Sequence, residues 1–234
     1  MITVHCMVRN EEATIAYALL SVIDQAERVL ITDTGSTDRT RYWLDQIKKA
    51  YPKKVDLELR NDIPDSTDWR FHQRNPPNYS LSAIRLEMIR RTQTRFIWVL
   101  DGDEIYRDIS RKQVGDLVSQ WPDGKRVAYL PLLWFGQDIR SLARTDPPTY
   151  GFTGRVFVNE GLLIHGAFPG EVHTYQGEDL GPESPWAFRA SWIEPFHHYE
   201  MLTKPWRRKI MGALPYSGPQ PEVFARYGSN GKHR

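Results

Sequence analysis

Two carboxylates, Asp101 and Asp103, directly follow a short apolar run, and their types and spacing could hold a metal ion. Five of the six residues in 95–100 are apolar, a run too short for a helix and typical of a buried central strand. A glycine between the carboxylates, Gly102, permits the turn that lets both converge where the strand ends. Hard oxygen ligands suit Mg²⁺ or Mn²⁺, which keep positions open for water and substrate phosphates. The stretch therefore predicts a metal-nucleotide site.

The same acidic stretch, residues 101–104, has other interpretations. It is typical of an acidic turn ahead of a helix, where carboxylates are favoured anyway. An EF-hand loop is excluded, because Ile105 stands where a third oxygen ligand belongs and Tyr106 replaces the glycine. A phosphatase of the haloacid dehalogenase type also begins with Asp-x-Asp after an apolar strand, but it would carry Gly-Thr where this chain has Glu104 and Ile105.

The elements that must position this site follow from apolar periodicity and turn residues. Strands are expected at 2–8, 28–32, 54–59 and 95–100, and helices at 13–22, 41–50, 79–92 and 110–120. This alternation predicts a parallel sheet with helices on both faces, in which ligands bind at the carboxyl ends of the strands. Neither G-x-G-x-x-G nor a P-loop occurs, so phosphate must be handled differently, which again favours a metal.

The second half of the chain has a different pattern, rich in strands and loops. Strands are expected at 127–135 and 154–158, and a helix at 199–214 that Pro205 interrupts. We expect one domain over residues 1–214. The Gly-, Pro- and Lys/Arg-rich tail, residues 215–234, is expected to be mobile.

Composition sets broad limits on function. The chain has 234 residues and a net charge of +2, from 31 basic and 29 acidic residues, so no strong field predicts nucleic acid or a membrane surface as a partner. Its one cysteine, Cys6, lies in an apolar strand and is expected to be buried and inert. No apolar run approaches the roughly 18 residues of a membrane span, and the N-terminus lacks a signal-peptide pattern, so we expect a cytoplasmic protein.

Four blocks in this order resemble the family 2 glycosyltransferases of the GT-A fold, which use nucleotide-sugar donors. They are residues 7–12 (MVRNEE), 33–40 (DTGSTDRT), 82–85 (SAIR) and 99–104 (VLDGDE). The resemblance covers the first half closely and the second half loosely, through 154–157, 166–171 and 198–199. It implies a Rossmann-like sheet, a nucleotide-sugar-binding half at 1–104 and an acceptor-binding half at 105–214.

The resemblance also implies which residues hold the donor. Val8, Arg9 and Glu11, at the end of the first strand, would hold the base and ribose together with Asp33, whose carboxylate can accept from the imide N–H of a uracil-like base. Arg85 would face the diphosphate, since a guanidinium suits phosphate oxygens. The family usually has Asn after this Arg, where this chain has Leu86. The alternatives are structural: Asp33 forms a turn ahead of Gly35, Asn10 caps the helix at 13–22, and Arg85 is a solvated helix residue.

By the same resemblance, Asp101 and Gly102 contact the nucleotide sugar, and Asp101 and Asp103 ligate the metal. The third metal ligand would be His198, with His197 as the rival, and an imidazole favours Mn²⁺ over Mg²⁺. The metal would neutralise the departing nucleoside diphosphate.

The catalytic base implied for the acceptor hydroxyl is Glu171, although Gly170 stands where relatives often carry His. The rival carboxylates are Asp138, Asp146, Glu178, Asp179, Glu183 and Glu194. Four second-half aromatics would line the acceptor cleft or fill a core: Trp134, Phe135, Trp186 and Trp192.

The expected function is therefore a metal-dependent inverting glycosyltransferase of the hexosyltransferase type, acting on a carbohydrate or other hydroxyl acceptor. Two alternatives stay open. A nucleotidyltransferase on a similar sheet would normally open with a Gly-rich basic loop, which residues 9–12 lack. A non-catalytic carbohydrate-binding protein fits the aromatic content but has no use for converging carboxylates.

Overall fold

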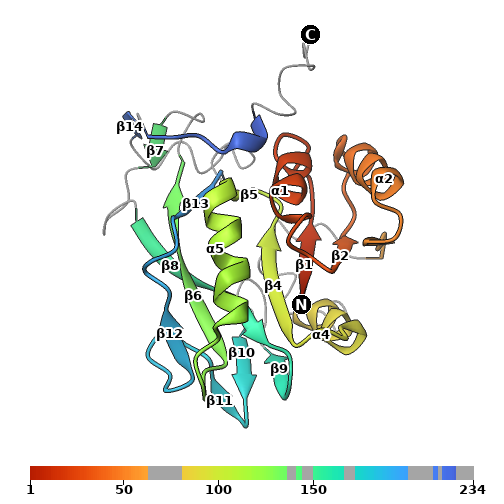
Figure 1. The fold of residues 1–234 in the computed structure, drawn as a ribbon. Helices are drawn as coiled ribbons and strands as arrows, with labels where there is room; N and C mark the ends of the chain where they lie inside the picture. The colour runs from red at the N-terminus through yellow and green to blue at the C-terminus, as the bar shows by residue number, and fades with distance from the viewer. Residues whose placement is uncertain are drawn as a thin grey trace.

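The structure is a computed structural model, and it describes residues 1–62, 81–135, 141–143, 150–165, 172–199, 213–215 and 218–224. Its centre is one curved sheet of nine strands, which Figure 1 shows edge to edge behind α1 and α5. In spatial order the strands are β3 (Val55–Leu59), β2 (Arg28–Asp33), β1 (Ile2–Val8), β4 (Phe96–Asp101), β8 (Tyr150–Val158), β6 (Val127–Trp134), β13 (Phe196–His198) and β5 (Glu104–Ile105), with β12 (Ala187–Arg189) beside β6.

Five strand pairs of this sheet are parallel and three are antiparallel. Counted across the sheet from β3, the first four strands, β3, β2, β1 and β4, are all parallel to one another. The next strand, β8, is antiparallel to β4. The predicted α/β class with a mostly parallel sheet and a strand-rich second half is confirmed. Because β1 lies between β2 and β4, the strand order reverses at β1, which is where ligands bind in open α/β sheets.

The remaining elements are short. The helices are α1 (Ile15–Val22), α2 (Thr40–Ala50), α4 (Leu81–Arg91) and α5 (Asp108–Ser119). Two smaller sheets contain β9 (Leu162–His165), β10 (Val172–Tyr175) and β11 (Glu178–Asp179), and β7 (Ser141–Ala143) with β14 (Ala213–Pro215). None of the helices in these described ranges is long and apolar enough to cross a membrane.

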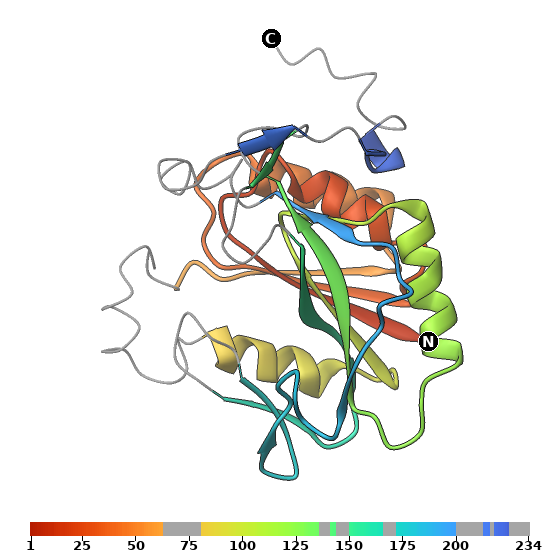
Figure 2. The same cartoon turned by 90° about the vertical axis from the view of Figure 1, so that its left-hand side faces the viewer.

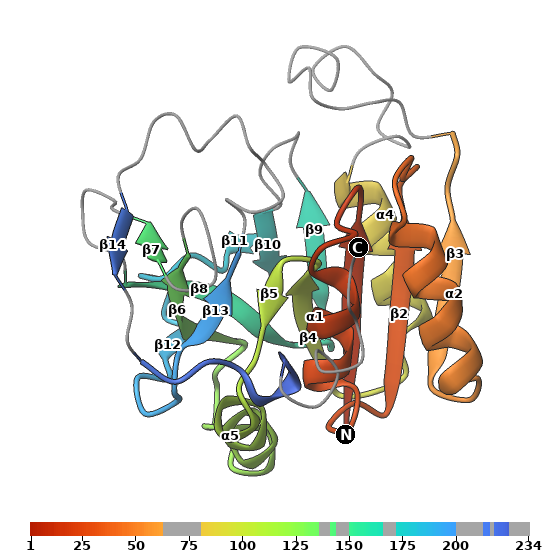
Figure 3. The ribbon, with the colours of Figure 1, turned by 90° about the horizontal axis from the view of Figure 1, so that it is seen from above.

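Strand β1 shows how both faces of the sheet are covered. Val4 and Cys6 belong to the large core that α1, α2 and α5 share with the sheet, whereas Met7 packs with α4 on the opposite face. Figure 2 shows α1 and α2 on one side of the strands and α4 with β9 and β10 on the other, and Figure 3 shows the same layers from above. Cys6 is buried, as expected, and burial raises the pKa of its thiol well above its usual value.

Two predictions for the C-terminal part need correction. Ala213 and Leu214 belong to strand β14 rather than to a helix ending at 214, because they pair with β7; residues 200–212 lie outside the described ranges. Residues 218–224 of the predicted mobile tail pack on the domain. Val223 is 3% exposed, and the Phe224 ring lies 5.0 Å from that of Tyr17. This part of the tail therefore belongs to the folded domain.

Candidate active site

The carboxyl ends of β1, β2 and β4 bring the predicted residues to one edge of the sheet. Val8 pairs with Asp33 across β1 and β2, and Met7 pairs with Asp101 across β1 and β4. The loops after these three strands therefore line a common edge, as the alternation of strands and helices predicts. In this arrangement Gly102 lies against Val8 and Glu11, the residues at the start of the neighbouring loop.

The loops after β1 and β2 are joined by hydrogen bonds. Thr37 N donates to Asn10 Oδ1 at 2.8 Å, Asn10 N donates to Ser36 Oγ at 3.0 Å, and Glu11 N donates to Thr40 Oγ1 at 2.8 Å. Asn10 has a φ of 55°, in the left-handed region that asparagine tolerates better than most residues. The alternative in which Asn10 caps the following helix is wrong, since α1 begins later, at Ile15, and Asn10 serves this inter-loop contact.

Asp33 is fully buried, and both of its carboxylate oxygens have partners. Its Oδ1 accepts from Ser36 N at 2.9 Å and Ser36 Oγ at 2.7 Å, while Oδ2 accepts from Arg41 Nε at 2.7 Å. Arg9 Nη1 donates to the Thr34 carbonyl at 3.1 Å, which ties the two loops together again. Asp33 thus shapes the loop, and both of its oxygens are engaged within the protein itself.

Arg85 lies on α4 but is buried, with 2% of its surface exposed. Its charge acts on two histidines, the buried His5 of β1 and the half-buried His173 of β10. Burial first, and then the charge of Arg85, lowers the pKa of His5 well below its usual value and the pKa of His173 to about 3. The alternative of a solvated helix residue is therefore wrong. Contact with a diphosphate remains a prediction.

Asp101, at the end of β4, is held by an arginine from β8. Arg155 Nη2 donates to Asp101 Oδ2 at 2.7 Å, and the same guanidinium also bonds Glu104 Oε1. Glu104 has no exposed surface, and its Oε2 accepts from Asp101 N at 3.2 Å. Burial raises the pKa of Glu104 to about 7, and the charge of Arg155 opposes this rise. The antiparallel pairing of β4 with β8 thus fixes the first carboxylate of the motif.

Asp103 and His198 meet because β13 pairs with β5 on one side and with β6 on the other. In this register His198 stands opposite both Glu104 and Trp134, and Tyr199 N donates to the Asp103 carbonyl at 2.8 Å. His198 Nε2 lies 3.3 Å from Asp103 Oδ1. The structure therefore brings together the second carboxylate and the histidine that the resemblance implies as metal ligands.

His197 faces the core instead. It is 1% exposed, its ring packs on Phe135 at 4.6 Å, and its Nδ1 lies 3.1 Å from the Tyr199 hydroxyl. Burial lowers its pKa to about 3. Of the two neighbouring histidines, His198 is the one that points to Asp103, because alternate residues of a strand face opposite sides of the sheet.

A divalent cation fits the Asp103 and His198 pair. Adjacent ligands of an octahedral ion at roughly 2.1 Å would lie about 3.0 Å apart, close to the 3.3 Å between these two atoms. A carboxylate oxygen with an imidazole nitrogen suits Mn²⁺. No group of three or more His, Cys, Asp and Glu side chains that could hold a metal occurs among the described residues. Arg155 engages one oxygen of Asp101, Oδ2, so the other oxygen, water and substrate could supply further ligands.

The predicted base, Glu171, lies outside the described residues, as do 166–170 and the rivals Asp138 and Asp146. Three other rivals are in or beside β11, which Figure 1 places at the opposite end of the second half from β5 and β13: Glu178, Asp179 and Glu183. Glu194 N donates to Gln113 Oε1 at 2.7 Å, and the Glu194 carboxylate pairs with Arg107. Glu194 is therefore engaged by residues of α5 and of the turn before it.

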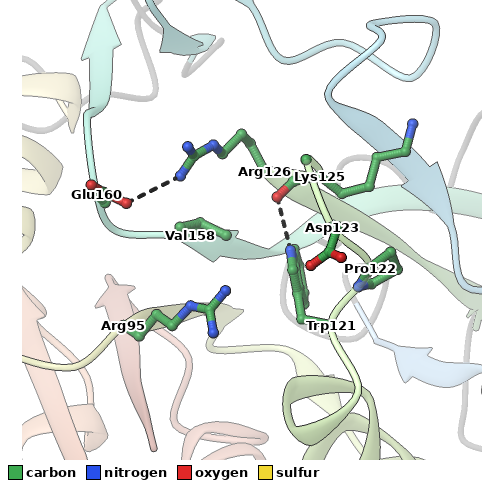
Figure 4. Close-up of a pocket in the computed structure, with 9 residues that line it drawn as sticks. Arg95, Trp121, Pro122, Asp123, Lys125, Arg126, Val158 and Glu160 are labelled. Atoms are coloured by element: carbon green, nitrogen blue, oxygen red, sulfur yellow. Dashed lines mark hydrogen bonds and ion pairs between the residues drawn. The ribbon is translucent and has the colours of Figure 1, made fainter.

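A separate cavity of about 150 Å³ lies far from these residues, at the start of β4 (Figure 4). Two of its charged side chains, Arg126 and Glu160, pair with each other at 3.5 Å. Trp121 Nε1 donates to the Lys125 carbonyl at 2.8 Å. We therefore do not assign the candidate site to this cavity.

Sequence reasoning missed three contributors. Arg155 and Glu104 form a buried ion pair, and Trp134 contacts His198. The sequence alone placed Glu104 in an acidic turn and Arg155 in a loosely matching family block. It placed Trp134 in a cleft or a core. Each contact depends on antiparallel pairing or on the position of β13 between β5 and β6. A buried-strand arginine at Arg155, between apolar neighbours, is the signal that could have pointed to a partner carboxylate.

Comparison with known proteins gives one match at the level of sequence families. The model described as glycosyl transferase family 2 matches residues 3–168. No curated protein matches the chain.

Among solved structures, a TarS structure from S. aureus aligns at 16% identity with a TM-score of 0.42, covering 68% of this chain and 47% of that one. Glucosyl-3-phosphoglycerate synthase from Mycobacterium tuberculosis, in complex with Mn²⁺, uridine diphosphate and phosphoglyceric acid, aligns at 16% identity with a TM-score of 0.39, covering 57% and 43%. The present chain thus spans less than half the length of these two structures.

Proposed function

Because the chain belongs to the family 2 glycosyltransferases and has their GT-A type of fold, we propose that it transfers a sugar from a nucleoside-diphosphate sugar to an acceptor hydroxyl, with inversion and with a divalent metal. The observation that carries the proposal is the meeting of Asp103 Oδ1 and His198 Nε2, 3.3 Å apart, at the carboxyl edge of the sheet. A non-catalytic carbohydrate-binding protein has no need for this pair.

Residues from the first half would hold the donor. The joined loops after β1 and β2 carry Val8, Arg9, Glu11 and Asp33, which would contact the base and ribose at the point where the strand order reverses. Asp101, oriented by Arg155, would receive the ribose or contact the metal. A side chain already held in one rotamer loses little entropy when the donor binds.

The metal would be held by Asp103 and His198, with Mn²⁺ favoured over Mg²⁺, and it would supply positive charge to the departing diphosphate. The structure of the synthase from M. tuberculosis named above contains Mn²⁺ and uridine diphosphate, which supports this choice for the present chain. A metal at this position would also neutralise the negative charge of Asp103, which is 2% exposed.

The acceptor hydroxyl needs a base. We assign this role to Glu171 from the resemblance. The carboxylate would take the hydroxyl proton as the oxygen attacks the anomeric carbon from the face opposite the leaving diphosphate, which inverts that carbon. The second half of the chain, 105–214, would then bind the acceptor.

A thermal-shift panel tests this function. Nucleoside diphosphates and nucleotide sugars are added with Mn²⁺, with Mg²⁺ or with chelator, because a ligand that binds the native state raises the melting temperature. We expect one nucleotide family to raise it, and only with metal. A nucleoside triphosphate that stabilises the protein where every diphosphate sugar fails would favour the nucleotidyltransferase instead.

A further inference from the structure

Trp134, His198 and Asp103 form a row of three side chains across β6, β13 and the turn before β5. The indole Nε1 of Trp134 lies 2.8 Å from His198 Nδ1, and the other ring nitrogen of His198 faces Asp103 Oδ1 at 3.3 Å. The backbone register fixes this row, since Trp134 and His198 stand opposite each other in adjacent parallel strands.

The indole N–H of Trp134 determines which ring nitrogen of His198 carries a hydrogen. An indole N–H can only donate, so His198 Nδ1 must accept and carries no hydrogen. A neutral imidazole has one N–H, which is then on Nε2 and points to the Asp103 carboxylate. The hydrogen on Nε2 therefore lies on the side of the ring that faces Asp103 Oδ1, 3.3 Å away.

This arrangement conflicts with metal ligation at the same nitrogen. A metal ligand must offer a lone pair, so a neutral His198 bound through Nε2 would carry its hydrogen on Nδ1. Two N–H groups would then face each other across the 2.8 Å between Trp134 and His198. The Trp134 hydrogen bond and metal ligation by Nε2 therefore exclude each other.

We infer that Trp134 is a positioning residue that holds metal-free His198 in the Nε2–H tautomer, and that its indole releases the ring when a divalent cation binds Nε2. This inference rests on the proposed function, which supplies the cation. The release makes the Trp134 hydrogen bond a competitor of the metal. It also couples metal occupancy to the last residues of β6, at the edge of the half that would bind the acceptor.

Nuclear magnetic resonance of the full chain tests the tautomer directly. Long-range ¹H–¹⁵N spectra of the His198 ring, assigned with His198→Ala, should show a protonated Nε2 and a bare Nδ1 without metal. The indole N–H of Trp134, assigned with Trp134→Phe, should shift when diamagnetic Mg²⁺ is added with uridine diphosphate, while the hydrogen on His198 moves to Nδ1.

Metal affinity gives the second readout. Trp134→Phe keeps an aromatic side chain and removes the N–H, so it should bind Mn²⁺ about two- to tenfold more tightly than the wild type, as expected from the loss of one competing hydrogen bond. The matched control is Trp121→Phe, which removes an indole N–H that donates to the Lys125 carbonyl, beside the first residue of β4. This control should bind Mn²⁺ as the wild type does.

The two ideas fail in different ways. If Mg²⁺ moves the hydrogen on His198 while the Trp134 indole stays bonded, or if Trp134→Phe binds Mn²⁺ more weakly, the inference about Trp134 is wrong and the metal site stands. If neither the His198 nor the Trp134 signals respond to Mg²⁺ or Mn²⁺, the metal site of the proposed function is wrong, and the role of Trp134 falls with it.

Discussion

Gly102 lies so close to Val8 that a Cβ atom added to the glycine would stand 3.0 Å from Val8 Cγ2. The same atom would also lie 3.1 Å from Glu11 Cγ. Gly102 is not among the residues with positive φ, so the glycine is required by the space between the two loops rather than by an unusual backbone angle. The contact links the carboxylate turn after β4 to the loop after β1.

Replacing Gly102 by Ala should therefore disturb both loops. We expect a loss of about 1–3 kcal/mol in the free energy of unfolding, typical of overpacking, and weaker nucleoside diphosphate binding, because Val8 and Glu11 must move. Urea denaturation and calorimetric titration measure the two effects. Gly181→Ala is the matched control, since an added Cβ there meets no atom within 4 Å. Equal behaviour of the two variants would contradict the close packing.

The two neighbouring histidines should separate metal binding from stability. His198→Ala should weaken metal-dependent nucleotide binding with a small effect on stability, because this side chain lies at the site edge beside Asp103. His197→Ala should cost about 2–4 kcal/mol of stability, because it leaves a cavity against Phe135, while the protein that remains folded keeps its metal dependence. The reverse order would mean that His197 is the ligand.

The buried His5 predicts a stability loss in mild acid. Burial lowers its pKa well below 6.5, and the charge of Arg85 lowers it further. The unfolded chain therefore takes up a proton near pH 6.5 that the folded chain refuses. The free energy of unfolding is therefore unaffected by the protonation of His5 above that pH. Below it, the free energy of unfolding falls by about 1.4 kcal/mol per pH unit. Urea titrations at pH 7, 6 and 5 should give a shallower slope in His5→Gln; an unchanged slope would contradict this role.

Local patterns predicted the first half of the fold well. Strand β1 has the expected bounds, and β2, β3, β4, α2 and α5 lie within two residues of theirs. The apolar residues of these elements recur regularly because one or both faces pack on a core. This regularity can be recognised within a short stretch of sequence. The helix expected to end at 214 is wrong at that end because Ala213 and Leu214 pair with a distant strand, and no local signal reports such a partner.

The site was predictable as a set of residue types but not as a set of contacts. Asp103 and His198 were both expected, and the structure brings them together. The ion pairs of Arg155 with Asp101 and of Arg41 with Asp33 could not be predicted, since both depend on side-chain geometry set by tertiary packing. The division of the domain at residue 104 and the role of Glu171 remain predictions.

Glu171→Gln separates the base from the donor site. Gln keeps the shape and hydrogen-bonding capacity of Glu but cannot take a proton, so transfer should fall by about 10²- to 10⁴-fold while donor and metal binding change little. Steady-state transfer assays and nucleotide titrations report the two properties. Glu178→Gln, in the exposed strand β11, is the matched control. Full activity in Glu171→Gln, or loss of donor binding, would place the base on another carboxylate.

The most direct test of the metal site is calorimetric titration of a nucleoside diphosphate into wild type and Asp103→Ala, each with Mn²⁺ and with excess chelator. The carboxylate of Asp103 faces His198 at 3.3 Å, so its removal leaves the ion with one protein ligand of the pair. We predict that Mn²⁺ tightens binding to the wild type by at least about tenfold and leaves binding to Asp103→Ala unchanged. Equal affinity of the wild type with Mn²⁺ and with chelator would contradict a metal-dependent site.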